Sequence, residues 1–147
     1  MKHVLFVCTG NTCRSPMAEA IFNHFAKQEG LGYRAKSAGL YVSLSKEEEK
    51  ARVALKPYGI VIRHKPTKIT KSMFSNCDLV LTMTGEQKLL LEREIKSDKL
   101  LSIAECTAGI DISDPYGYGQ EEYNNTAKLL VFSIKTLITK LKGGKNG

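Results

Sequence analysis

The sequence predicts an α/β fold of three layers, in which a four-stranded parallel sheet is flanked by helices on both faces. Two observations predict it. Short strand-like apolar runs alternate with longer segments of helical periodicity. The 147 residues, 42% hydrophobic and 25% charged, also fit one domain of ordinary globular composition, which excludes disordered and fibrous architectures. We expect one domain over residues 1–142 and a flexible tail over residues 143–147.

The first expected strand, His3–Val7, is a continuous apolar run, which is typical of a strand buried on both faces. The other expected strands follow at Tyr33–Ala38, Asp78–Met83 and Lys99–Ile103. Parallel sheets bind ligands at the carboxyl ends of their strands. The segment after the first strand is therefore the first place to look for a functional site.

Capping residues predict where the helices begin and end. Ser15 is the expected N-cap of the first helix, with Pro16 as its first residue and Gly30 at its end. Capping boxes precede the two middle helices: Ser45 with Glu48 for a helix ending at Gly59, and Thr84 with Gln87 for one reaching Glu94. The last helix carries one apolar face, formed by Tyr123, Ala127, Leu130, Val131, Ile134, Leu137, Ile138 and Leu141.

The net charge of +7, from 22 basic and 15 acidic residues, attracts anions at long range. Nucleic acid, anionic membranes and phosphorylated substrates all fit that charge. The basic stretches Arg63–Lys71 and Lys135–Lys145 lack the interleaved aromatic residues that stack on bases, and no apolar run is long enough to span a bilayer. No signal-peptide pattern opens the chain. We expect a cytoplasmic protein that binds neither nucleic acid nor membrane.

The cysteines do not form the pattern of a metal site. Cys8 and Cys13 are the nearest pair, no second pair follows, and the remaining two are Cys77 and Cys106. A cytosolic chain of this size also needs no disulfide bonds. We expect neither a metal nor another cofactor.

The segment from Cys8 to Ser15 joins the first strand to the first helix, where backbone N–H groups and the positive end of a helix dipole converge. A phosphate dianion fits such a junction. Gly10 permits a tight path, and Arg14 supplies a planar guanidinium that can hold two phosphate oxygens. This environment favours the thiolate form of Cys8, which could attack phosphorus and form a phosphocysteine.

Such a displacement needs a general acid for the leaving group. Asp114 precedes Pro115, which restricts its backbone and stiffens the loop. Asp111 is a nearby competitor, but it lacks both the rigid proline and the aromatic neighbour Tyr116. We therefore expect Asp114 to be the acid.

The segment Val7–Glu19, which reads V-C-T-G-N-T-C-R-S-P-M-A-E, and the later Asp114-Pro115-Tyr116 resemble the low-molecular-weight protein tyrosine phosphatase family. The resemblance implies a metal-free protein phosphatase with the same four-stranded parallel sheet. It implies that Cys8 is the nucleophile, that Arg14 binds phosphate and stabilises the transition state, and that Asp114 is acid and then base. The implied substrate-binding residues are Thr9, Gly10, Asn11, Thr12, Cys13, Ser15, Tyr41 and Tyr116.

Two of these residues carry further implied roles. Asn11 would hold the conformation of the loop, and Ser15 would donate a hydrogen bond to the thiolate of Cys8. Cys13 has two open interpretations: it could capture an oxidised Cys8 as a disulfide, or it is a small buried loop residue. Tyr41 and Tyr116 are expected to form two walls of the pocket, and the alternative for either is simple surface packing.

The loop also bears on the substrate. Thr12 resembles the threonine of the protein arginine phosphatase branch, where tyrosine-directed members usually carry isoleucine, and Gly117 also resembles that branch. Isoleucine would crowd a guanidinium that lies across the loop. We therefore predict phosphoarginine residues of proteins as substrates, with inorganic phosphate or other oxyanions as product or inhibitor. Phosphotyrosine is the alternative. Arsenate reduction is a remote one, because Cys77 and Cys106 do not form a closely spaced redox pair.

Overall fold

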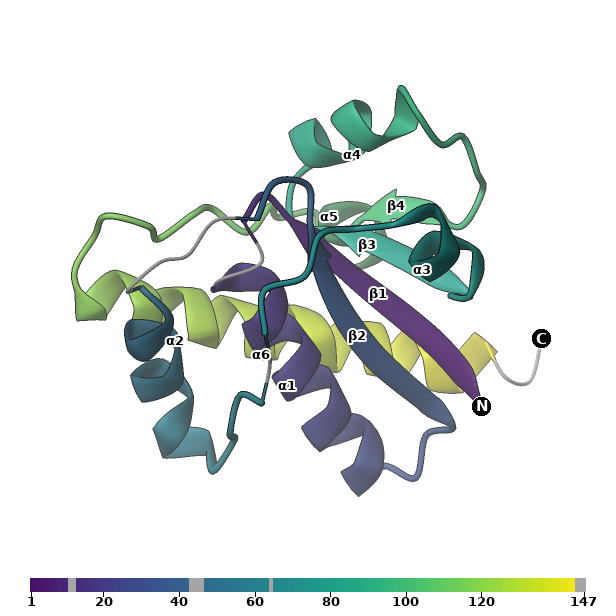
Figure 1. Ribbon diagram of the computed structural model, residues 1–147. Helices are drawn as coiled ribbons and strands as arrows, with labels where there is room; N and C mark the ends of the chain where they lie inside the picture. The colour runs from purple at the N-terminus through teal and green to yellow at the C-terminus, as the bar shows by residue number, and fades with distance from the viewer. Residues whose placement is uncertain (11–12, 43–46, 64, 145–147) are drawn as a thin grey trace.

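The computed structural model describes residues 1–10, 13–42, 47–63 and 65–144 (Figure 1). Its sheet has the order β2-β1-β3-β4, and every neighbouring pair is parallel. The strands are β1 (Lys2–Cys8), β2 (Tyr33–Gly39), β3 (Leu79–Thr82) and β4 (Leu100–Ser102). All four strands were expected, and their ends differ from the expected ones by at most one residue. At Ile103 the expected strand is wrong, because that residue begins a helix.

The helices comprise the four that were expected and two short ones that were not. They are α1 (Arg14–Gln28), α2 (Glu48–Leu55) with the 3-10 helix η1 (Lys56–Tyr58), α3 (Lys71–Ser75), α4 (Gly85–Glu92), α5 (Ile103–Cys106) and α6 (Gln120–Gly144). The helices α3 and α5 have five and four residues, too few to show a helical period in the sequence. Within the described ranges, no helix is both long and apolar enough to cross a membrane.

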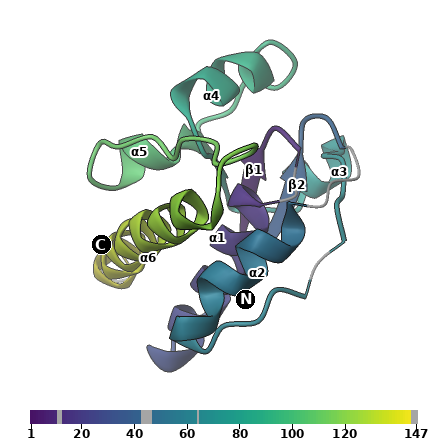
Figure 2. The same cartoon turned by 90° about the vertical axis from the view of Figure 1, so that its left-hand side faces the viewer.

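The sheet is covered on both faces (Figure 2). Val4 and Phe6 of β1 belong to the larger core, which α1, α2 and α6 complete. Leu5 and Val7 point to the other face, where they join Phe74 of α3 and Leu91 of α4, among others, in a smaller core. Alternate residues of β1 therefore face two cores, which explains its continuous apolar run. The predicted three-layer α/β fold is confirmed.

Three helix ends differ from the expected ones or lie outside the described residues. Ser15 is not the N-cap of α1, because the helix begins at Arg14 and Cys13 occupies the N-cap position. Pro16 is consequently the third helical residue, where an N–H group would still have no partner within the helix. α6 continues through Gly144 and so includes the first two residues of the expected tail. Ser45 lies outside the described residues, and the N-cap of α2 is Glu47.

Candidate active site

The site forms at the carboxyl end of β1, which is an inner strand of the sheet. Cys8 is the last residue of this strand and is buried. Its carbonyl accepts a hydrogen bond from the N–H of Leu40 at 3.0 Å, and the carbonyl of Thr9 accepts one from the N–H of Tyr41 at 2.8 Å. These two bonds fix the start of the loop after β1 against the loop after β2.

Ser15 turns its side chain toward Cys8 instead of capping α1. The Oγ atom of Ser15 lies 2.9 Å from the Sγ atom of Cys8, and both side chains are buried. A hydroxyl at this distance can donate to a sulfur anion and stabilise it. The contact is the one that the family resemblance implied for Ser15.

Arg14 is the first residue of α1, and its side chain is 5% exposed. One terminal nitrogen, Nη1, donates a hydrogen bond to the carbonyl of Ile112 at 2.9 Å, while Nη2 lies 3.5 Å from the carboxylate of Asp114. Among the described residues, the buried Nε of Arg14 has no hydrogen-bond partner. A buried N–H group without a partner costs about 1–3 kcal/mol, so a bound oxyanion would be stabilised here.

Asp114 lies in the loop between α5 and α6 with its side chain 47% exposed. The N–H of Tyr116 donates a hydrogen bond to its Oδ1 at 3.0 Å, which fixes the carboxylate within its own turn. The competing carboxylate, Asp111, instead accepts a hydrogen bond from the N–H of Gly85 at the start of α4, at 3.2 Å. Of the two aspartates, Asp114 is thus the one that contacts Arg14.

Cys13 lies between these groups. It is buried, and its Sγ is 3.9 Å from Oδ1 of Asp114. Burial, together with the negative charges of Cys8 and Asp114, raises the pKa of Cys13 to about 12. Cys13 therefore remains a neutral thiol at physiological pH. Neither Cys8 nor Cys13 forms a disulfide bond in this structure.

One residue at the site was predicted only as a helix cap. Gln87, in the first turn of α4, is buried and its Nε2 donates a hydrogen bond to Oγ1 of Thr9 at 3.0 Å. Its Oε1 accepts hydrogen bonds from the N–H groups of Met83 and Thr84. Because the contact with Thr9 joins residues 78 positions apart, no local sequence signal could have predicted it.

The remaining predicted residues are arranged around this group. Tyr41 and Tyr116 are 69% and 57% exposed, in the loops after β2 and around Asp114. Gly10 is half-buried in the bend after β1. Asn11 and Thr12 lie outside the described residues. Across the ranges that the structure covers, no three His, Cys, Asp or Glu side chains are grouped so that they could hold a metal ion.

The family model for low molecular weight phosphotyrosine protein phosphatases matches residues 3–146. The chain belongs to this family. A protein-arginine-phosphatase of Bacillus subtilis is 36% identical, and the match covers 95% of this chain and 96% of that protein. Members of the family are protein phosphatases, so this chain is a hydrolase that acts on phosphorylated proteins.

Solved structures of the family share the fold. A mutant YwlE arginine phosphatase with a phosphorylated active-site serine superimposes with a TM-score of 0.90 at 35% identity, covering 95% of each chain. A low molecular weight protein tyrosine phosphatase from T. tengcongensis has a TM-score of 0.88 and 41% identity, covering 95% of this chain and 99% of that one. The chain is thus similar to phosphatases named for either phosphoresidue.

Proposed function

We propose that this phosphatase uses Cys8 as its nucleophile, Arg14 as its phosphate-binding residue and Asp114 as its general acid and base. The observation that carries the proposal is the buried Arg14 guanidinium, which is held by Ile112 and Asp114 and has an Nε without a partner among the described residues. Arg14 directly precedes Ser15, whose hydroxyl contacts the sulfur of Cys8. A nucleophile, an oxyanion-binding cation and an acid are thereby grouped at one helix N-terminus.

The reaction has two displacements. The thiolate of Cys8 attacks phosphorus and forms an S–P bond while the bond from phosphorus to the leaving nitrogen or oxygen breaks, and protonated Asp114 gives its proton to that atom. Water then attacks the phosphocysteine, Asp114 takes a proton from it, and the S–P bond breaks to release phosphate and the thiolate. The phosphorylated serine in the YwlE mutant, at 35% identity, supports a covalent intermediate of this kind.

We propose phosphoarginine residues of proteins as the substrate. The arginine phosphatase names of the relatives from Bacillus subtilis and Geobacillus stearothermophilus, both 36% identical, support this choice. Thr12 supports it from the sequence, since a threonine leaves more room beside the loop than isoleucine. Phosphotyrosine remains the second candidate, because the T. tengcongensis enzyme named for tyrosine is 41% identical.

A side-by-side assay tests the substrate. The purified protein is given two peptides of one sequence, one carrying phosphoarginine and the other phosphotyrosine, and kcat/KM is measured for each. We expect the phosphoarginine peptide to react faster and Thr12→Ile to shift the ratio toward phosphotyrosine. Faster turnover of phosphotyrosine by the unaltered protein would contradict the substrate, and an unchanged ratio in the variant would contradict the role of Thr12.

We also propose that the protein works in the cytoplasm. A catalytic thiolate needs a reducing compartment, and Cys8 is not part of a disulfide bond. Its partners in this proposal are phosphorylated proteins and oxyanions, not nucleic acid or membrane. Salt-sensitive RNA or DNA binding that survives Cys8→Ser would contradict that part of the proposal.

A further inference from the structure

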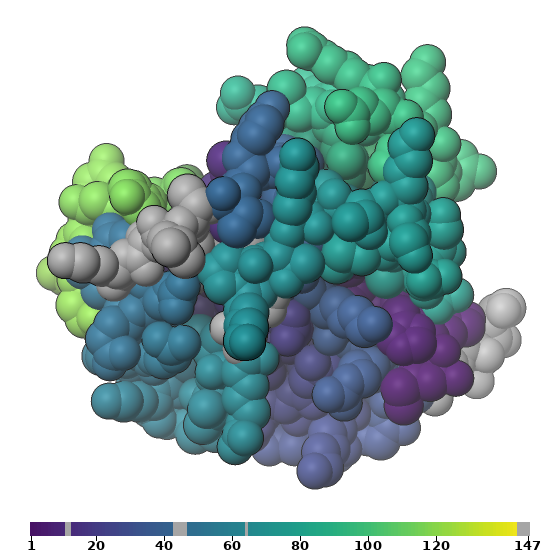
Figure 3. Space-filling model, in the orientation of Figure 1, coloured from purple at the N-terminus to yellow at the C-terminus, as the bar shows by residue number. Residues whose placement is uncertain are grey.

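A groove of about 290 Å³ lies beside the candidate active site, between the loop after β2 and α4. Figure 3 shows the segments around it on one face: the loop after β2 in dark blue, residues 65–70 in teal, and α4 in green. Tyr41 belongs both to the lining of the groove and to the loop that is bonded to Thr9. Tyr41 therefore links the lining of the groove to Thr9, the residue that follows Cys8.

The groove has an apolar floor and partly apolar edges. Leu91 is buried, while Leu40 and Ile69 are half-buried. At the edges, Leu90 is 39% exposed and Tyr41 is 69% exposed. An apolar side chain of a bound segment would remove this surface from water, at about 25 cal/mol per Å².

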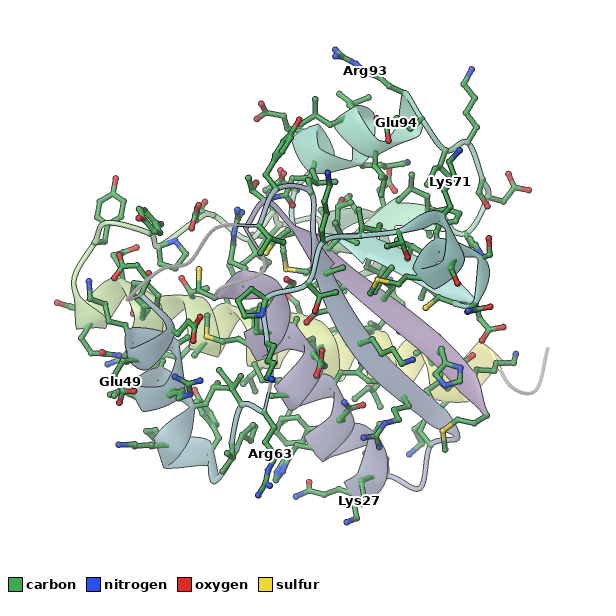
Figure 4. All side chains as sticks on the ribbon, viewed as in Figure 1. Lys27, Glu49, Arg63, Lys71, Arg93 and Glu94 are labelled. Carbon is green, nitrogen blue, oxygen red and sulfur yellow. The ribbon has the colours of Figure 1, made fainter. Side chains whose placement is uncertain are left out.

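Two cations and one anion complete the lining. Lys68 and Arg93 are exposed, and in the part of the chain that the structure describes neither forms an ion pair. The one acidic lining residue is Glu94, which is exposed at the end of α4 beside Arg93 (Figure 4). The groove is thus net positive, on a protein whose net charge is +7. Its charge is complementary to an acidic ligand.

We propose that this groove binds the part of the phosphorylated protein substrate that flanks the phosphoresidue, and that it selects an apolar side chain next to a carboxylate. The proposal rests on the proposed function, because Cys8 holds the phosphoresidue. Because Tyr41 is bonded to Thr9, next to Cys8, the residues that flank the phosphoresidue would lie over Tyr41. The leucine and isoleucine floor receives the apolar side chain, and Lys68 and Arg93 face the carboxylate.

The test uses three phosphopeptides that share one phosphoresidue and differ only in an acidic–leucine, a neutral or a basic flank, beside para-nitrophenyl phosphate. We expect kcat/KM to be highest for the acidic–leucine peptide. The double variant with Lys68→Glu and Arg93→Glu should lose about ten-fold on that peptide, because both charge reversals replace attraction to the acidic flank by repulsion. Turnover of para-nitrophenyl phosphate should change less than about two-fold, because the small substrate does not reach the groove.

Lys27→Glu is the matched control, because Lys27 is an exposed cation at the end of α1, far from Arg93 (Figure 4). It should leave the order of the three peptides unchanged. Equal kcat/KM for the three peptides, or an order that the double variant keeps, would overturn the proposal while para-nitrophenyl phosphate still reports an active enzyme. If no substrate turns over, the proposed function fails. Peptide Kd values measured on the Cys8→Ser variant then still show whether the groove prefers the acidic–leucine flank.

Discussion

The N-termini of α1 and α4 both follow a strand of the same parallel sheet, yet they are built in opposite ways. At α4, Thr84 and Gln87 form a complete capping box, and the N–H of Gly85 donates to Asp111. At α1, Cys13 occupies the N-cap position and makes no side-chain capping bond. Ser15, the hydroxyl residue of its first turn, contacts the sulfur of Cys8.

This difference in capping indicates that the N-terminus of α4 has a structural role, whereas the N-terminus of α1 is suited to bind an anion. A capping box satisfies N–H groups that would otherwise have no partner, and it stabilises a protein by about 1 kcal/mol. Among the described residues the N-terminus of α1 has no side-chain cap, so its dipole can stabilise an anion, and Arg14 lies at the same helix end. The loop between α5 and α6 contacts both helix ends. Asp111 accepts a hydrogen bond from the N–H of Gly85 in α4, and Asp114 lies beside Arg14 of α1. Four predictions follow from this contrast.

The largest effect is expected for Cys8→Ser. Serine keeps a hydroxyl beside Ser15 but is a far weaker nucleophile than a thiolate, so turnover should be abolished. Phosphate or vanadate should still bind, because Arg14 and the N-terminus of α1 are unchanged. Steady-state kinetics and calorimetric titration with phosphate measure the two properties. Loss of phosphate binding together with turnover would mean that α1 does not provide the anion site.

The second largest effect is expected for Asp114→Asn, and turnover should depend far less on Asp111. Asp114→Asn removes the proton donor, and general acid catalysis contributes about 10²- to 10⁴-fold. The loss should be large for poor leaving groups and small for good ones, as measured on a series of aryl phosphates. Asp111→Asn is the matched control. It should reduce stability slightly and leave the dependence on the leaving group unchanged. Equal losses across the series for Asp114→Asn would indicate a structural role.

The same contrast explains which parts of the molecule the sequence could predict. The capping box of α4 is local, so Thr84 and Gln87 predicted it correctly. Ser15 and Pro16 looked like an ordinary helix start, and that prediction failed because Ser15 meets Cys8, seven residues away on the preceding strand. Strands and long helices have local periodicity, whereas α3 and α5 are too short to show it. Asp114 was expected at the site from chemistry, as the general acid, whereas its contact with Arg14 and the bond from Gln87 to Thr9 depend on tertiary packing.

Removing the hydroxyl of Ser15 at α1 or of Thr84 at α4 is expected to have a smaller effect, but it compares the two helix ends directly. Ser15→Ala should lower kcat/KM by about 10- to 100-fold, since a hydrogen bond to a charged group contributes about 1.5–3 kcal/mol. Thr84→Ala should instead cost about 1 kcal/mol of unfolding free energy and change kcat/KM little. Urea unfolding and steady-state kinetics of both variants give the comparison. If Ser15→Ala lost only stability, or Thr84→Ala lost mainly activity, the distinction between the two helix ends would be wrong.

Gln87 connects the N-terminus of α4 to the loop after β1, because its Oε1 belongs to the capping box of α4 while its Nε2 donates to Thr9. Thr9→Val removes the bond to the loop and keeps the box, whereas Gln87→Ala removes both. We expect Thr9→Val to lower kcat/KM several-fold with little loss of stability, and Gln87→Ala to lower both.

A double-mutant cycle on kcat/KM isolates the shared bond. The two losses should not add, and their coupling should be about 1 kcal/mol, because the second substitution has no bond left to break. Additive losses would show that Gln87 acts only on α4. A positive coupling would mean that the capped end of α4 positions the start of the loop after β1, through a side chain whose place in the sequence gives no sign of that role.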